Sequence, residues 1–208
     1  MYLPDAFRED DLATLHTLMR HYSFATLITQ QHGQPFVSHL PFILEANDGP
    51  YGTLLGHMAR ANPQWRDFAT TAEVVVVFQG PHTYVSPSWY ETVLSVPTWN
   101  YAVVHAYGTP RLIEERDACY ALLRRLVQTY EAGFARPWPF ALPEEYVHRM
   151  MQGIVCFTIH LTRLEGKFKL SQNRPMVDRQ RVVEALQASG DPEGGAVAAL
   201  MQQRVLET

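Results

Sequence analysis

The chain has 208 residues, 47% hydrophobic and 18% charged, which is enough for one full core or at most two small ones. Its formal net charge of −4 excludes a strongly basic face, so DNA contact would need a local patch or an oligomer. No apolar run is long enough to span a membrane, and the first residues lack the basic and apolar regions of a signal peptide. We therefore expect a cytoplasmic protein with no membrane partner.

The first half of the chain predicts a helix followed by strands. Acidic residues precede apolar residues spaced three and four apart, which predicts an amphipathic helix over about 9–21. Turn-forming residues then separate extended runs. We expect strands over 24–29, 35–44, 51–58 and 73–79, with a hairpin turn at 32–34, a short helix over about 63–70 and a chain turn at Gly80–Pro81.

The second half predicts two further strands and most of the helices. A strand over 99–108 should continue over 110–113 beyond a bulge or kink, because Pro110 interrupts it. A helix through about 132 should bury Tyr120, Leu123, Leu126, Val127 and Tyr130. The remaining expected elements are a short helix at 144–152, a last strand at 154–164, a connector at 166–174 and helices at 176–188 and 196–206, separated by a break at 189–195.

This order of elements predicts a fold that is mainly β with α. Six or seven strands with few helices between them favour antiparallel pairing over alternating βαβ units. We expect an antiparallel barrel over 1–174 with helices packed outside it, and a helical extension over 175–208 packed on the barrel.

The stretch Gly56–Trp65 has the features of a phosphate site. Asn62 can cap a helix and Pro63 suits its first position. A helix start carries partial positive charge and unpaired amides, and Arg60 and His57 lie just before it. The alternative is a capped surface helix with ordinary polar neighbours.

Three other polar and aromatic clusters stand out: residues 80–90, residues 96–101 with His105 and Gly108 after them, and residues 169–174. Each could also be a packed turn, a sheet edge or a capped surface loop. Together with Gly56–Trp65 they offer tryptophan and tyrosine faces for a planar ring and cations for its phosphate.

Other chemistries lack their patterns. The nine histidines show no metal-binding spacing, and neither a serine-hydrolase elbow nor a Walker or Rossmann glycine pattern occurs. The acidic pairs at 114–115 and 144–145 are helix starts rather than catalytic carboxylates. Cys119 and Cys156 lie in apolar surroundings and are expected to be inert core thiols, not a disulfide framework. No catalytic residue can be assigned.

These clusters carry a resemblance to a known family. The motifs Met1-Tyr2-x-Pro4, Gly56–Trp65, Phe78–His82, Ser86–Tyr90, Val96–Tyr101 with Val104-His105, and Lys169–Arg174 together resemble the PaiB family of FMN-binding negative transcriptional regulators. The resemblance runs from residue 1 to about 175 and implies a dimeric split β-barrel with flavin clefts between the subunits.

The resemblance also implies which residues bind FMN. The segment from His57 to Asn62 would hold the phosphate, with Arg60 and the helix start replacing the basic motif of nitroimidazole-reductase relatives. The strand around His39 and Pro41 would face the flavin ring, and Trp99, Asn100 and Tyr101 would reach it from the partner subunit. The remaining expected FMN-binding residues are Ser88, Trp89, Lys169 and Gln172.

Three functions remain open from the sequence. The first is an FMN-binding negative regulator, although a seven-residue break at 189–195 is long for a helix-turn-helix and only Arg179, Arg181 and Arg204 make 176–206 basic. The second is a flavin- or haem-dependent oxidoreductase, in which the cofactor supplies the chemistry. The third is a dimeric scaffold without a cofactor.

Overall fold

A computed structural model describes residues 1–31, 33–69 and 73–206. His32, in the expected hairpin turn, and Thr70, the expected end of the short helix, lie outside the described residues. The sheet has the strand order β3-β2-β6-β7-β8-β5-β4, with β1 paired to β8. Its strands are β1 (Arg8–Glu9), β2 (Phe24–Gln31), β3 (Gln34–Pro41), β4 (Ile43–Glu45), β5 (Thr53–Ala59), β6 (Val74–Val85), β7 (Thr98–Ile113) and β8 (Ile154–Lys169).

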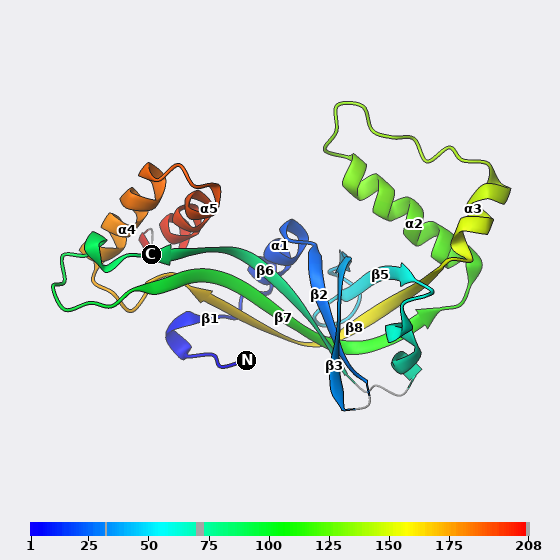
Figure 1. The fold of residues 1–208 in the computed structure, drawn as a ribbon, viewed down its shortest axis with the longest axis horizontal. Coiled ribbons are helices and arrows are strands. Elements are labelled where there is room, and N and C mark those ends of the chain that lie inside the picture. The colour runs from blue at the N-terminus through cyan, green and yellow to red at the C-terminus, as the bar shows by residue number, and fades with distance from the viewer. Residues whose placement is uncertain (32, 70–72, 207–208) are drawn as a thin grey trace. The chain divides into compact units, whose positions relative to one another are not determined.

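The chain forms two compact units. Unit 1 contains Met1–Leu18, Phe78–His105 and the residues from Glu165 on, and unit 2 contains Met19–Val77 and Ala106–Leu164. The three long strands β6, β7 and β8 contribute residues to both units (Figure 1). The mainly antiparallel sheet with several helices confirms the predicted fold class, and the expected hairpin is the antiparallel pair of β2 and β3. The division into 1–174 and 175–208 stays a prediction.

In unit 2, helix α2 (Arg116–Glu131) lies on a core that includes Ile43 of β4 and Cys156 of β8. Helix α3 (Glu144–Met151) and the 3-10 helix η2 (Pro63–Ala69) belong to the same unit. The predicted buried stripe of α2 is partly wrong, because Cys119, Leu122 and Leu126 are buried whereas Tyr130 is 42% exposed. The helix is rotated so that Cys119, rather than Tyr120, faces the sheet.

That rotation joins the two cysteines. Cys119 and Cys156 form a disulfide with their Cα atoms 5.6 Å apart, within the usual range for such bonds. The expectation of two inert thiols was therefore wrong. Their separation of 37 positions in the sequence hid a contact that exists only once α2 packs on β8.

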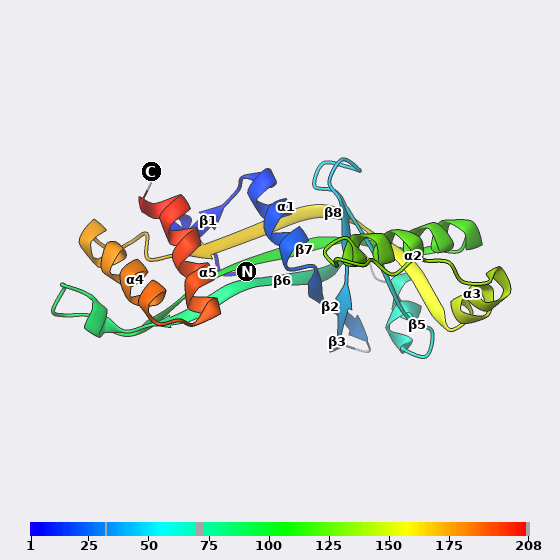
Figure 2. The same ribbon diagram turned by 90° about the horizontal axis from the view of Figure 1, so that it is seen from above.

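In unit 1, helices α4 (Met176–Ala188) and α5 (Pro192–Met201) lie side by side (Figures 1 and 2). The π-helical turn η4 (Gln202–Leu206) follows them, and the 3-10 helices η1 (Asp5–Phe7) and η3 (Pro87–Trp89) belong to this unit. The predicted seven-residue break is wrong: residues 189–191 separate the helices, with Gly190 at a φ of 69°. Asp191 caps α5 by accepting a hydrogen bond from the Gly194 amide at 2.9 Å.

Two strands, β6 and β8, run further than the sequence predicted, whereas β7 reaches Ile113 as expected. Strand β6 continues through Gly80–Pro81, where a turn was expected, because a Cβ on Gly80 would lie 2.9 Å from the carbonyl oxygen of Ala102. Gly80 therefore permits close backbone approach instead of a turn. Strand β8 extends through the expected connector to Lys169, and β7 includes Pro110 without ending.

Asp178 of α4 anchors the segment that follows η3. Its carboxylate accepts hydrogen bonds from the Glu91 amide at 2.8 Å and from the Thr92 hydroxyl at 2.6 Å. Asp178 itself is fully buried, and the bond from the Thr92 hydroxyl is the main reason that its pKa lies below the ordinary 3.8. The folded chain therefore prefers the ionised carboxylate.

Asp178→Asn should lower the melting temperature at pH 7 by roughly 3–8 °C, because an amide nitrogen would replace one acceptor. The folded pKa is depressed, so the stabilisation is complete above the unfolded pKa and is lost as pH falls through the folded value. Thermal unfolding followed between pH 7 and pH 3 should show the two melting temperatures converging at the acid end. Asp10→Asn, at an exposed carboxylate, is the control, and a constant gap across this range would contradict the assignment.

Candidate functional site

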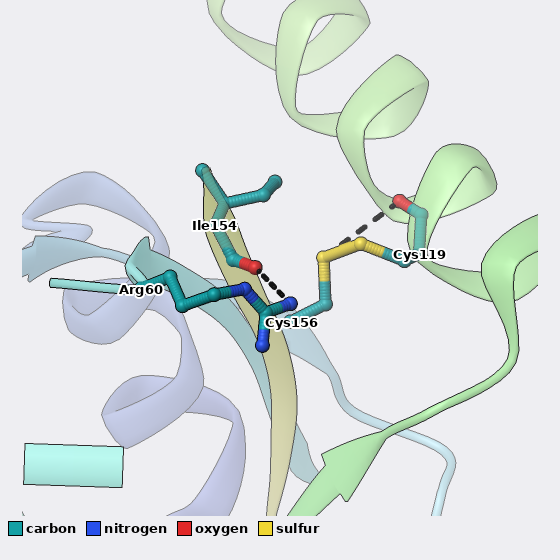
Figure 3. The surroundings of a disulfide bond; sticks show 4 residues. All are labelled: Arg60, Cys119, Ile154 and Cys156. Carbon is teal, nitrogen blue, oxygen red and sulfur yellow. Dashed lines mark hydrogen bonds between the residues drawn. A yellow bond between two sulfur atoms is a disulfide. The ribbon is translucent and has the colours of Figure 1, made fainter. Parts of the chain in front are cut away.

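Arg60 lies at the corner between β5 and η2 and is fixed by main-chain carbonyls. Its amide donates to the Gly153 carbonyl and its Nε to the Gln152 carbonyl, each at 2.8 Å. Its Nη2 donates to the Ile154 carbonyl at 2.8 Å, the bond drawn in Figure 3. The Trp65 indole donates to the Arg60 carbonyl at 3.0 Å. Within the described residues, Arg60 forms no ion pair with a carboxylate and its Nη1 makes no hydrogen bond, so the charge is uncompensated.

The predicted cap at Asn62 is confirmed, but the helix that it starts is a 3-10 helix of seven residues. The Asn62 side chain accepts from the Gln64 amide at 3.1 Å and donates to the Ser38 hydroxyl at 2.9 Å. The amide oxygen of Asn62 thus caps η2, and its amide nitrogen ties the corner to β3. A short 3-10 helix offers no aligned dipole for a phosphate.

Gln64 is the residue of this corner that the sequence analysis missed. It is fully buried, and its Nε2 donates to the Thr29 hydroxyl at 3.2 Å and the Phe36 carbonyl at 3.1 Å. These bonds tie η2 to the β2–β3 hairpin. Phe68 is buried as expected, whereas Trp65 is half-buried. Because Gln64 is a polar residue in a short predicted helix, nothing in the sequence indicated that its side chain would be buried.

The other expected FMN residues of unit 2 lie on strands. His39 is exposed on β3, where its Nδ1 is 3.0 Å from the Thr26 hydroxyl, and Pro41 ends the same strand. His57 lies on β5, directly opposite Cys156 of β8. Burial lowers the pKa of His57, and its buried Nδ1 has no hydrogen-bond partner within the described residues.

A cavity of about 510 Å³ opens beside Arg60 in unit 2. Its walls come from the β5–η2 corner, the end of β7, helices α2 and α3 and the start of β8. The lining residues are Arg60, Trp65, Leu112, Ile113, Glu114, Arg116, Cys119, His148, Met151, Gln152, Ile154, Val155 and Cys156. The sequence analysis missed Arg116 and His148, which come from separate helices.

In unit 1 the structure joins two of the predicted clusters. Lys169, at the end of β8, donates to the Thr98 hydroxyl at 2.5 Å and to the Trp99 carbonyl at 2.6 Å. Burial, together with the nearby charges of Lys167 and Arg174, lowers the pKa of Lys169. The motifs at 96–101 and 169–174 therefore lie side by side, as a shared site requires.

Two expected FMN residues of this region have structural bonds. Asn100 is fully buried, and its Nδ2 donates to the Ser171 hydroxyl at 2.9 Å. Ser171 has a φ of 67°, which the bond to Asn100 helps to hold. The Gln172 side chain accepts from the Leu170 amide at 2.7 Å and donates to the Phe168 carbonyl at 2.5 Å. Both amides thus fix the ends of β7 and β8.

Trp99 is 52% exposed and belongs to an aromatic cluster on β6 and β7. The rings of Tyr84 and His82 lie 6.0 Å and 6.3 Å from it, and a cavity of about 360 Å³ adjoins this face. Tyr101 also lines that cavity. Alternation along two neighbouring strands is the signal that could have identified Tyr84.

Ser88 and Trp89 lie in η3, close to the start of that cluster in sequence but not joined to it by a described hydrogen bond. Ser86 caps η3 by accepting from the Ser88 amide at 3.2 Å, and the two hydroxyl groups are 2.7 Å apart. Among the described residues, no group of three or more His, Cys, Asp or Glu could hold a metal ion. In this same part of the chain, no helix has both the length and the apolar character needed to cross a membrane.

Sequence comparisons with known proteins indicate one family. The family model described as "Putative FMN-binding domain" matches residues 1–163. The protease synthase and sporulation protein PAI 2 of Bacillus subtilis is 36% identical over 99% of this chain and 98% of its own length. An uncharacterised protein of Emericella nidulans is 32% identical over 98% of this chain and 97% of its own length.

Solved structures share the fold at low sequence identity. The FAD and haem binding protein of Mycobacterium smegmatis has a TM-score of 0.61 at 16% identity, covering 88% of this chain and 80% of that chain. The flavocytochrome Anf3 of Azotobacter vinelandii has a TM-score of 0.59 at 16% identity, covering 78% and 69% respectively. These matches confirm the split-barrel class.

Gln64→Leu should destabilise the chain by about 1–3 kcal/mol, because two buried acceptors on β2 and β3 would lose their donor. Urea unfolding measures the change in the free energy of unfolding. Gln128→Leu, on the exposed side of α2, is the matched control and should change it by less than about 0.5 kcal/mol. Equal effects of the two substitutions would show that the Gln64 bonds do not hold the corner.

Proposed function

We propose that this chain, which belongs to the PaiB family of proteins with an FMN-binding domain, binds FMN as a homodimer and acts as a negative regulator. The observation that carries the proposal is the exposed Trp99, held beside Tyr84 and a cavity of about 360 Å³. A half-exposed tryptophan on a sheet face is costly to leave in water, and a flavin ring can stack on it.

The aromatic cluster fits the ring end of FMN. The Lys169 bonds to Thr98 and to the Trp99 carbonyl fix the strand that presents the indole. Lys169 also places a positive charge near this face, and its partial burial lowers its pKa together with the charges of Lys167 and Arg174. Asn100 and Gln172 contribute by holding the strand ends, while Ser88, Trp89 and Tyr101 complete the expected set in unit 1.

Arg60 fits the phosphate end. Its uncompensated charge and its Nη1 group offer a phosphate a charge-assisted hydrogen bond. Asn62 would act by holding the corner in place, since its own amide is bonded to Ser38 and Gln64. His57 of β5 completes the phosphate end, and His39 and Pro41 of β3 would face the flavin ring from the same unit.

The homodimer follows from this division into two halves. One subunit would supply the phosphate half from unit 2, and its partner would supply the aromatic half from unit 1. Unit 1 also exposes Val93 and Leu94 at 93% each and Val96 at 69%, an apolar surface that association would cover.

Bound FMN would supply electron-transfer chemistry, and the residues of this chain would bind and orient it. Stacking on Trp99 would exclude water from one face of the ring. Lys169 would raise the positive potential at the aromatic end, and Arg60 would neutralise the phosphate. Burial lowers the pKa of His57, so its ring would be neutral and would add no second positive charge beside Arg60.

We also propose that regulation takes place in the cytoplasm and does not use α4 and α5 to read DNA. Their turn is short enough for a helix-turn-helix, but their cations are engaged elsewhere. Arg181 pairs with Glu91, Arg204 with Glu9, and Arg179 donates to the Arg174 carbonyl at 2.7 Å. Helix α5 contains no lysine or arginine.

Trp99→Ala should weaken FMN binding at least tenfold, because the stacking surface is removed. Quenching of FMN fluorescence during titration measures the dissociation constant. Trp138→Ala is the matched control, since Trp138 is 45% exposed in unit 2 and outside the proposed site. Unchanged affinity in Trp99→Ala, or an equal loss in both variants, would rule out the aromatic cluster as the ring site.

A gel-shift assay should show no preference of the wild-type dimer for the DNA upstream of its own gene over a random fragment of equal length. Any retardation should disappear between low and moderate salt, as expected for non-specific phosphate contacts. A specific shift that survives moderate salt and is lost in Arg181→Ala would contradict the proposal that α4 and α5 do not read DNA.

A further inference from the structure

The disulfide of unit 2 forms part of a cavity wall. Figure 3 shows the disulfide that joins Cys119 of α2 to Cys156 of β8. Both cysteines line the cavity of about 510 Å³, and Cys119 is the more accessible, at 8% exposure against 1%. We propose that this cavity admits a small anionic thiol, which exchanges with the Cys119–Cys156 disulfide. The exchange itself takes place at the two cysteines, neither of which belongs to the proposed flavin site, whereas the cavity shares Arg60 with the proposed phosphate end.

The charges around the cavity favour an anion. The guanidinium groups of Arg60 and Arg116 line it, against the single carboxylate of Glu114, and the Arg116 guanidinium lies 2.8 Å from Nδ1 of His148. Glu144 lies 3.6 Å from Arg116 and 3.5 Å from His148, but its side chain is 81% exposed and solvent screens it. Arg60 has carbonyl partners instead of a carboxylate, so its charge remains available to attract a thiol that carries a carboxylate or sulfonate.

The size and lining of the cavity also suit a small ligand. Cavities of about 300–1,000 Å³ with mostly apolar walls and a few polar groups are typical of small-molecule sites. Here the apolar wall is formed by Leu112, Ile113 and Met151, with the disulfide beside them.

The reaction consists of two thiol–disulfide exchange steps, and its atoms and electrons balance. A thiolate attacks the Cys119 sulfur, forms a mixed disulfide there and expels Cys156 as a thiolate, which takes up a proton. A second thiolate attacks the sulfur of the bound thiol, which releases Cys119 as a thiolate that is protonated in turn. The protein disulfide is reduced by two electrons, and two external thiols are oxidised to one disulfide.

His57 is placed to serve the leaving sulfur. It lies opposite Cys156 in the antiparallel pair of β5 and β8, so both side chains are on the same face of the sheet. Its Nδ1 is buried and makes no hydrogen bond to any residue that the structure describes. The unpaired nitrogen of this neutral ring can accept a hydrogen bond from the Cys156 thiol once the disulfide opens. His57 thus acts through Cys156, as a positioning residue for the exchange.

The reaction has a structural consequence for α2. The disulfide links this helix to β8, within the core that also contains Leu122 and Ile43. Disulfides of cytoplasmic proteins are usually transient, catalytic or redox-sensing. In the proposed cytoplasmic location, the concentration of small thiols would determine whether the disulfide links α2 to β8.

The experiment compares three small thiols on the protein as purified: 2-mercaptoethanesulfonate, 2-mercaptoethanol and cysteamine, which are anionic, neutral and cationic. Release of Cys119 and Cys156 thiols is followed by alkylation and mass spectrometry, and rates are normalised to thiolate concentration. We expect the anionic thiol to react about fivefold faster than the neutral one, and the cationic thiol to be slowest. Added salt should reduce these differences.

Charge variants of the wall provide the controls. Arg116→Gln should remove most of the preference for the anionic thiol, and Glu114→Gln should increase it. Arg124→Gln, on the exposed side of α2 and outside the cavity, should leave it unchanged. Both cysteines found free in protein handled without reductant would overturn the proposal. Equal rates for the three thiols, or equal effects of Arg116→Gln and Arg124→Gln, would also overturn it.

Discussion

The corner between β5 and η2 is held by the hydrogen bonds of three polar side chains. Arg60 donates to carbonyls of the α3–β8 connection, Asn62 bridges η2 and β3, and Gln64 donates to acceptors on the β2–β3 hairpin. These bonds set the position of Arg60, the proposed cationic contact of the phosphate. They also leave the Arg60 charge without a carboxylate, which makes the corner suitable for an anion.

The sequence predicted most elements because their periodicity is local. The helices α2, α3 and α4 and the strands β2, β5 and β7 lie close to their expected ranges. The errors occur where distant segments decide the outcome. Gly80 gives a turn signal, but Ala102 of β7 approaches it so closely that glycine is needed within a strand. The buried face of α2 depends on the sheet beneath it, which a helical repeat does not specify.

The candidate site was likewise predicted where short motifs carry the information, and it was missed where contacts between distant segments decide the structure. Motifs predicted that Trp99 and Lys169 belong together, and their hydrogen bonds place them side by side. The motifs did not distinguish residues that can contact a ligand from residues that hold the backbone in place. Asn100 is of the second kind. The pairing of Cys119 with Cys156, and the approach of Arg116 and His148 to Arg60, are contacts between separate elements and gave no signal in the sequence.

The proposed flavin-binding homodimer, with a cofactor site completed by two subunits, is tested most directly by the visible spectrum of freshly purified protein together with an FMN titration followed by sedimentation. We expect a flavin spectrum, or uptake of about one FMN per chain, in a dimeric species. A colourless protein that takes up no FMN, or a monomer that binds it fully, would rule out the proposed homodimeric site.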